Sequence, residues 1–78
     1  MAMNDWKEVC EAAGFEPRKM SPIDVYELGG RIIHDPVIRI LKGPVAQANG
    51  GLVEMGTTVA LLKQMSEADR AALRERVR

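Results

Sequence analysis

The stretch from Leu52 to Met65, LVEMGTTVALLKQM, constrains the fold of this chain more than any other segment. Four apolar residues in it recur at i, i+3, i+7 and i+10, namely Leu52, Met55, Val59 and Leu62. This spacing aligns side chains along one face of a helix, and neighbouring Val, Ala and Leu residues widen that face. A helix that is apolar nearly all round must be covered from several sides, so we expect the other segments or a second chain to surround it.

A chain of 78 residues makes one small domain, which we place at residues 1–78. Such a domain buries only about 60% of the surface that its unfolded chain exposes, so its stability margin is modest. It contains one Trp, one Tyr and one Phe, and its core must therefore be built mainly from Ile, Val, Leu and Met. This aliphatic supply is too rich for a disordered chain.

The charges balance, with 11 basic and 11 acidic residues, so no global field draws the chain to nucleic acid or to an anionic membrane. Cys10 is the only cysteine, which excludes an internal disulfide and favours a reducing compartment. The N-terminus does not have the pattern of a signal peptide, and no apolar run is long enough to span a bilayer. We therefore expect a soluble, cytoplasmic protein.

The first helix is predicted to begin after Asn4, a capping residue, and to end at Gly14 in the left-handed conformation, with Phe15 folding back on the last turn. Its apolar stripe is Trp6, Val9, Cys10 and Ala13. A second helix begins at Ser21-Pro22, where Asp24 completes a capping signal. Gly29-Gly30 interrupts its stripe, so we expect a kinked helix that reaches about Ile33.

The third segment opens at Asp35-Pro36 by the same capping logic and is predicted to close at Gly43-Pro44. Its β-branched run VIRIL also fits a strand, so residues 31–41 could instead form a short hairpin. A last helix restarts at Ser66 and runs to the C-terminus. Together these patterns predict an all-α fold, a compact bundle of four to five short helices around a central apolar helix, residues 52–65.

No segment carries a convincing catalytic or metal-binding motif. The nearest nucleotide motif, from Gly51 to Thr58, lacks the lysine that contacts the phosphates. A thiol enzyme would need Cys10 near His34 and Asp35, but the thiol falls on a buried stripe and Asp35 serves as a cap. One Cys and one His also supply no metal-ligand cluster. We therefore predict a non-enzyme with no cofactor, no bound metal and no small-molecule substrate.

The C-terminal helix offers an alternative, a nucleic-acid-binding accessory or regulatory protein. Its candidate contacts are Arg70, Arg74, Arg76 and Arg78. Pairing with Glu67 and Glu75 and the helix dipole explain the same arginines without nucleic acid. A helix-turn-helix with its first helix at 45–48 would present an apolar recognition helix, which is a poor reader of DNA.

The surplus of aliphatic side chains points to a different function. One small core does not need them all, and a contiguous apolar patch left on the surface usually marks a partner site. We therefore predict a small protein-binding module, such as an adaptor, an assembly factor or an inhibitor, that binds another protein or copies of itself as a homo-oligomer. The contacts would lie on the helix face of Leu52, Met55, Val59 and Leu62.

Overall fold

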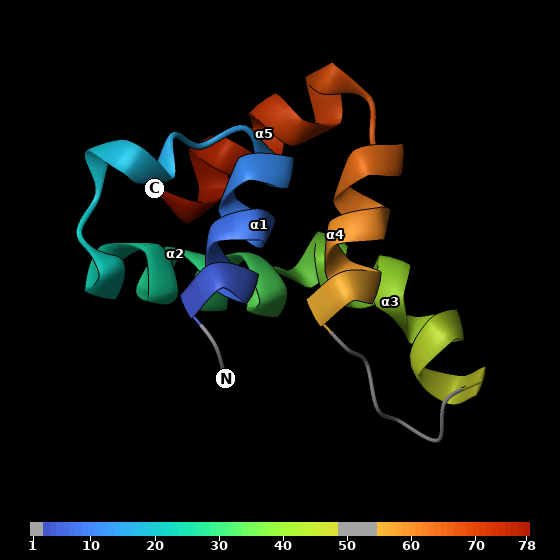
Figure 1. The fold of residues 1–78 in the computed structure, drawn as a ribbon. Coiled ribbons are helices and arrows are strands. Elements are labelled where there is room, and N and C mark those ends of the chain that lie inside the picture. Colours follow the sequence, from blue (N-terminus) through green and yellow to red (C-terminus); the bar gives the residue numbers. More distant parts are fainter. Residues whose placement is uncertain (1–2, 49–54) are drawn as a thin grey trace.

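The computed structural model describes residues 3–48 and 55–78, and these residues are almost entirely helical. In order, the elements are α1 (Met3–Ala13), the short 3-10 helix η1 (Pro17–Lys19), α2 (Pro22–His34), α3 (Pro36–Ala48), α4 (Met55–Gln64) and α5 (Glu67–Val77) (Figure 1). No strand occurs in this part of the chain, so the predicted all-α bundle is confirmed. Residues 31–41 are helical except at Asp35, and the hairpin alternative is wrong.

The N-termini of three helices are capped where the sequence predicts. Ser21 accepts a hydrogen bond from the backbone N–H of Asp24 at 3.1 Å, and the Asp24 carboxylate accepts one from the Ser21 N–H. Asp35 accepts from the N–H of Val37 at 2.9 Å, and Ser66 caps α5 in the same way. These bonds satisfy N–H groups that have no partner within the helix, and so fix where each helix begins.

Helix α1 ends in the predicted left-handed turn. Gly14 has φ of 95°, its N–H donates to the carbonyl of Glu11, and the N–H of Phe15 donates to the carbonyl of Cys10 at 2.9 Å. This is a Schellman motif, which satisfies the last carbonyls of the helix. The N-terminus differs slightly, because α1 begins at Met3 and so already includes the predicted cap Asn4.

Two glycine-containing pairs do not end their helices. Helix α2 continues through Gly29-Gly30 to His34. Trp6 packs directly on Gly29, where a side chain would collide with the indole, so the glycine there is required by packing. Helix α3 continues through Gly43-Pro44 to Ala48, which corrects the predicted end. Pro44 lacks the N–H that would bond the carbonyl of Ile40, but Ile40 lies at the surface, where water can replace that donor.

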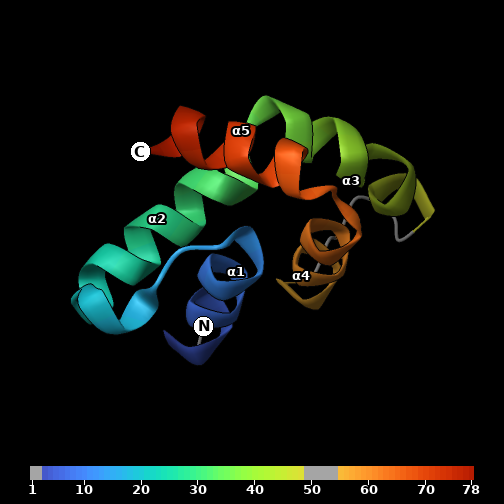
Figure 2. The same cartoon turned by 90° about the horizontal axis from the view of Figure 1, so that it is seen from above.

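The buried core gathers on α1 rather than on the segment predicted to be central. Helix α1 lies between α2 and α4 (Figures 1 and 2) and contributes the buried side chains of Trp6, Val9, Cys10, Ala12 and Ala13. Helix α4 begins at Met55 in the described part, and residues 52–54 lie outside it. Its apolar side chains spread around the helix, so only one of them, Leu62, is fully buried.

Candidate protein-binding surface

Exposed apolar side chains gather on the first half of α3. Ile40 is the most exposed large hydrophobic residue described, with 75% of its surface accessible, and Val37 and Leu41 are also exposed. Their spacing of i, i+3 and i+4 places all three on one side of the helix. Ile38 points the other way and is completely buried, so it anchors this surface to the core.

A shallow groove of about 310 Å³ runs beside these residues, where α3 meets the end of α4 and the start of α5. Val37 and Leu41 form one wall, and Leu61 and Met65 supply the apolar side chains opposite. Three polar residues complete the lining, namely Gln64, Ser66 and Asp69. We refer to Val37, Ile40, Leu41, Leu61 and Met65 together as the α3 surface. It is an apolar strip edged by polar groups, the arrangement found at many partner sites.

The composition of α3 contains the signal for this surface. Four of the five residues at 37–41 are apolar, whereas one side of a helix can bury only about half of such a run. The sequence therefore indicates that some of these side chains stay outside. It does not tell which ones, because the direction of Ile38 is set by packing against other helices.

The predicted contact residues lie mostly elsewhere. Leu52 falls outside the described residues. Met55 and Val59 are half-buried and pack against the core, and Leu62 is fully buried within the monomer. A folded copy of this chain therefore does not present Leu62 to a partner, and its hydrophobic burial stabilises the monomer itself.

The C-terminal arginines are already engaged by carboxylates of the same chain. Arg70 and Arg74 both pair with Glu67, at 3.1 and 2.7 Å, and Arg78 lies 3.8 Å from Glu75. Arg74 also donates to the backbone carbonyl of Ala13 at 2.9 Å and covers Gly14, so it closes the end of α1. The two arginines lower the pKa of the Glu67 carboxyl, the larger effect coming from the hydrogen bond of Arg74. Each of these three arginines therefore has a carboxylate partner within the described part of the chain.

Arg76 forms an ion pair that is held by two hydrogen bonds. Its Nε and Nη2 atoms donate to the two oxygens of Asp35 at 3.1 and 3.0 Å. The Asp35 side chain is buried, and the hydrogen bonds from Arg76 hold its pKa below the usual value against the opposing effect of burial. The same carboxylate caps α3 through Val37. Asp35 thus joins α5 to the junction of α2 and α3, which is a structural role.

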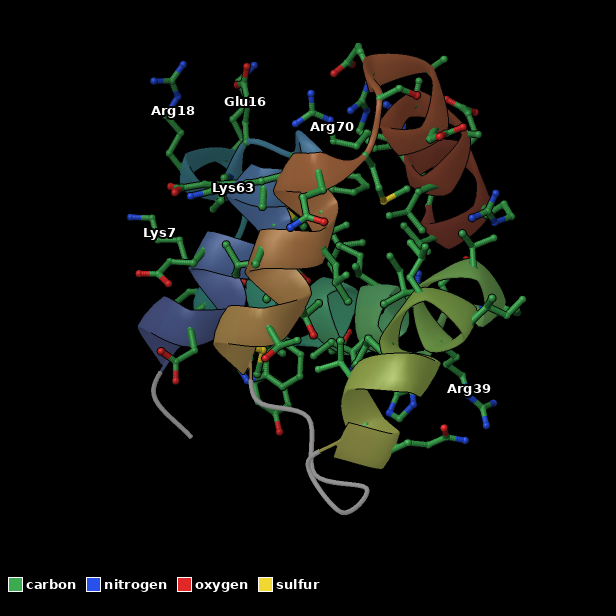
Figure 3. All side chains as sticks on the ribbon, turned by 90° about the vertical axis from the view of Figure 1, so that its right-hand side faces the viewer. Lys7, Glu16, Arg18, Arg39, Lys63 and Arg70 are labelled. Carbon is green, nitrogen blue, oxygen red and sulfur yellow. The ribbon has the colours of Figure 1, made fainter. Side chains whose placement is uncertain are left out.

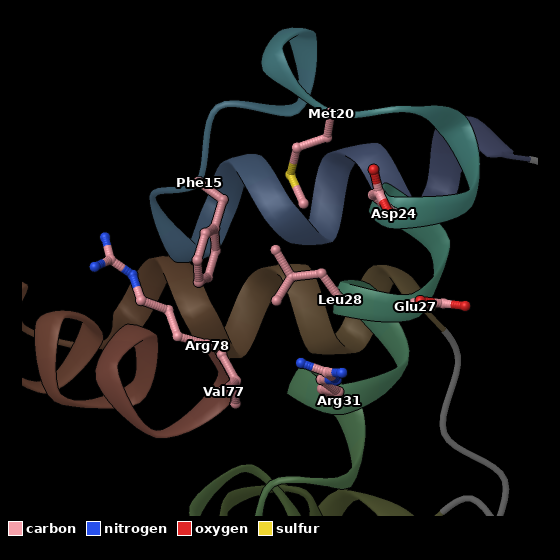
Figure 4. A pocket seen from close by; sticks show the side chains of 8 residues that line it. All are labelled: Phe15, Met20, Asp24, Glu27, Leu28, Arg31, Val77 and Arg78. Carbon is pink, nitrogen blue, oxygen red and sulfur yellow. The ribbon is translucent and has the colours of Figure 1, made fainter.

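Two other hollows differ from the α3 surface in chemistry. One of about 300 Å³ has a floor of Phe15, Met20, Leu28 and Val77, with Arg31 at its mouth (Figure 4). The larger, of about 510 Å³, is lined by Glu8, Glu11, Lys63 and Arg70, whose charges cancel, and by Ala12 and Val59. Figure 3 shows Lys63 and Arg70 on one side of the molecule, with Arg39 on the opposite side. The charged side chains that line the larger hollow therefore balance, and this hollow is not electropositive.

The residues considered for catalysis are not brought together as a reactive site. Cys10 is completely buried, and burial together with the nearby Glu11 raises its thiol pKa to about 11. The thiol donates to the carbonyl of Val25 at 3.5 Å, as an inert core cysteine does. His34 is exposed, and Asp35 is held by Arg76. Nowhere in residues 3–48 and 55–78 do three His, Cys, Asp or Glu side chains come close enough to hold a metal ion.

The nucleotide and DNA-binding motifs that the sequence disfavours fall partly outside the described residues. Residues 45–48, the proposed first helix of a helix-turn-helix, are the last turn of α3, and the turn at 49–51 is not described. Of the helices at 3–48 and 55–78, none is long and apolar enough to cross a membrane. The chain matches no family model, no curated protein and no solved structure with which it was compared.

Proposed function

We propose that this chain is a small, non-enzymatic protein-binding module that holds an apolar helical segment of another protein on the α3 surface. The observation that carries the proposal is the exposure of Ile40, at 75%, beside a groove with apolar walls. An isolated exposed Ile is ordinary. Here Val37, one turn before Ile40, and Leu41, next to it, lie on the same helix side and line the groove, which is the kind of surface that amphipathic helices bind.

The side chains of the α3 surface also indicate what kind of segment would bind there. The walls formed by Val37, Leu41, Leu61 and Met65 accept aliphatic or aromatic side chains spaced at i, i+3 and i+4. Leu61 and Met65 are half-buried and Met is flexible, so this wall can adjust its shape to different side chains. Asp69 stands at the edge of the groove and favours a basic residue on the partner at that end.

The experiment is affinity capture from an extract of the native cells, with nuclease added, followed by identification of the bound proteins. The parent chain is compared with Ile40→Asp, and the matched control is Ile23→Asp on α2, where the isoleucine is 68% exposed. Both substitutions replace surface residues, so circular dichroism should show the same folded helix content for all three proteins. We expect Ile40→Asp to lose the partner and Ile23→Asp to keep it.

Retention of the same partner by Ile40→Asp would show that the α3 surface is not the contact. Loss of the captured material on nuclease treatment alone would turn the interpretation toward nucleic acid. In that case replacement of Arg70 and Arg74 would become the next step, together with a measurement of salt dependence.

A further inference from the structure

The outward face of α2 is a second uncovered surface, separate from the α3 surface. Ile23 is 68% exposed, and Tyr26 is also exposed, although its ring packs edge-on against Trp6 with centroids 4.8 Å apart. Gly30 follows Ile23 and Tyr26 at i+7 and i+4, so the three residues share one side of the helix. We refer to Ile23, Tyr26, Glu27, Gly30 and Arg31 as the α2 face.

The two adjacent glycines of α2 differ in their surroundings. At Gly29 a side chain would collide with the ring of Trp6, so internal packing requires glycine there. At Gly30 an added Cβ would meet no atom within 4 Å. Glycine is among the least favourable residues in the interior of a helix, and nothing within the described chain compensates for it at Gly30. A glycine on an exposed helix face allows another backbone to approach closely.

The charged residues of the α2 face have opposite signs and form no ion pair with the rest of the described chain. Glu27 and Arg31 are both exposed, and in the described part of the chain neither lies within 4 Å of an oppositely charged group. Figure 4 shows the Glu27 carboxylate directed away from α1. Both charges are therefore available to a molecule that packs on this face.

We propose that two copies of the chain associate through the α2 face, with the two α2 helices antiparallel and crossing beside Gly30. A two-fold axis that passes midway between Glu27 and Gly30 places Arg31 of the second copy opposite Tyr26 and next to Glu27. The guanidinium then meets a carboxylate and an aromatic ring. The symmetry repeats the same contact in the other direction, so the α2 face is complementary to itself in charge.

The occupant is a second copy rather than an unrelated protein because one face supplies both signs of charge in the required register. The net charge of the chain is zero, so no long-range repulsion opposes the association. Helix α2 has 13 residues, which corresponds to a length of about 20 Å. A contact limited to one such helix is smaller than the roughly 800 Å² per partner of a typical stable interface, so the dimer is weak and reversible.

The test is sedimentation equilibrium of the full chain over roughly 10 μM to 1 mM, the range in which a weak dimer forms. Gly30→Leu fills the crossing point and should raise the dissociation constant at least about tenfold. The variant should melt no lower than the parent, because a Cβ at this position meets no atom within 4 Å and leucine favours the helix interior far more than glycine. Gly43→Leu is the matched control, since Gly43 is also inside a helix with open space around it, and it should leave the dissociation constant unchanged.

A charge exchange tests the register. Glu27→Arg and Arg31→Glu each place like charges together and should weaken the dimer, whereas the double variant restores opposite charges and should recover the parent dissociation constant. A chain that stays monomeric throughout, or a dimer that Gly30→Leu leaves intact, would overturn the proposal. A dimer lost in Ile40→Asp instead would assign self-association to the α3 surface. Capture of another protein does not depend on the α2 face, so each proposal can fail alone.

Discussion

Asp35 has two roles, as the cap of α3 and as the ion-pair partner of Arg76. Two substitutions at this position should destabilise the fold by different amounts and so separate the two contributions. The side chain is only 3% exposed, whereas that of Arg76 is 42% exposed. Asp35→Asn keeps an oxygen that can cap α3 but removes the negative charge that accepts both hydrogen bonds from Arg76. Asp35→Ala removes the cap as well. The difference in stability between Asp35→Asn and Asp35→Ala therefore measures the contribution of the cap. The loss of stability in Asp35→Asn measures the contribution of the ion pair.

The expected size follows from the burial of each partner. Removing one partner of a fully buried ion pair costs about 3–5 kcal/mol, and an exposed pair contributes about 0–1 kcal/mol. The Asp35 carboxylate is buried but Arg76 can turn to water, so we expect Asp35→Asn to cost about 2 kcal/mol. The cap adds about 1 kcal/mol, and Asp35→Ala should cost about 3 kcal/mol.

The assay is urea unfolding followed by the fluorescence of Trp6, the only tryptophan, which is buried in the native state. A small domain loses about 1 kcal/mol of stability per molar urea, so the midpoint of Asp35→Asn should fall by about 2 M. Glu75→Gln is the matched control, because it breaks an exposed pair with Arg78 and should leave the midpoint nearly unchanged. A midpoint for Asp35→Asn equal to that of the parent would refute the reasoning.

The pH dependence gives an independent check. Hydrogen bonds from Arg76 hold the pKa of Asp35 below its unfolded value of about 3.9. Its contribution to stability is therefore fully present above that value and is lost as the pH falls through the lower pKa of the folded state. The parent should lose stability below about pH 4 more steeply than Asp35→Asn does. Equal slopes would show that the carboxylate is not preferentially stabilised in the folded protein.

Three further substitutions and one chemical reaction test the packing of α1 and of the glycines in α2. Gly29→Ala should destabilise the fold by about 1–3 kcal/mol, because its methyl group would collide with the ring of Trp6. Gly30→Ala should stabilise the fold by about 1 kcal/mol, because alanine favours a helix more than glycine and its methyl group meets no other atom. Thermal melts will show whether the two changes in stability have opposite signs. Gly14→Ala should cost about 1–2 kcal/mol because φ there is 95°, measured by the same melts. Cys10, with a pKa of about 11, should react with iodoacetamide at pH 8 at least about 100-fold more slowly in the folded chain than in urea, and equal rates would contradict its burial.

The parts of the fold that could be predicted depend on neighbouring residues. Ser21, Asp35 and Ser66 each bond an N–H two or three residues ahead, and Gly14 reverses the chain by its own backbone freedom. Such signals need no tertiary contact, so the starts of α2, α3 and α5 and the end of α1 could be placed from the sequence. The all-α class followed from them.

The predicted contact face failed to reach the surface at Leu62 because periodicity shows which residues share a face, not what that face packs against. Leu62 lies on an apolar stripe that would suit either a core or an interface, and packing against α1 turned it inward. The run at 37–41 had the opposite outcome, since burial of Ile38 left Ile40 in solvent. The local sequence pattern does not determine whether either side chain points into the core or into solvent, because that depends on packing between helices.

The sequence alone determined where most helices begin and that the core is mainly aliphatic. Tertiary structure decided that α1 is the buried helix, that Asp35 and Arg76 meet across 41 positions of sequence, and that α3 and α2 keep apolar faces outside. The physical reason is that caps and turns act over a few residues, whereas burial is shared among all helices at once. Which face each helix turns inward is settled only when the whole chain packs.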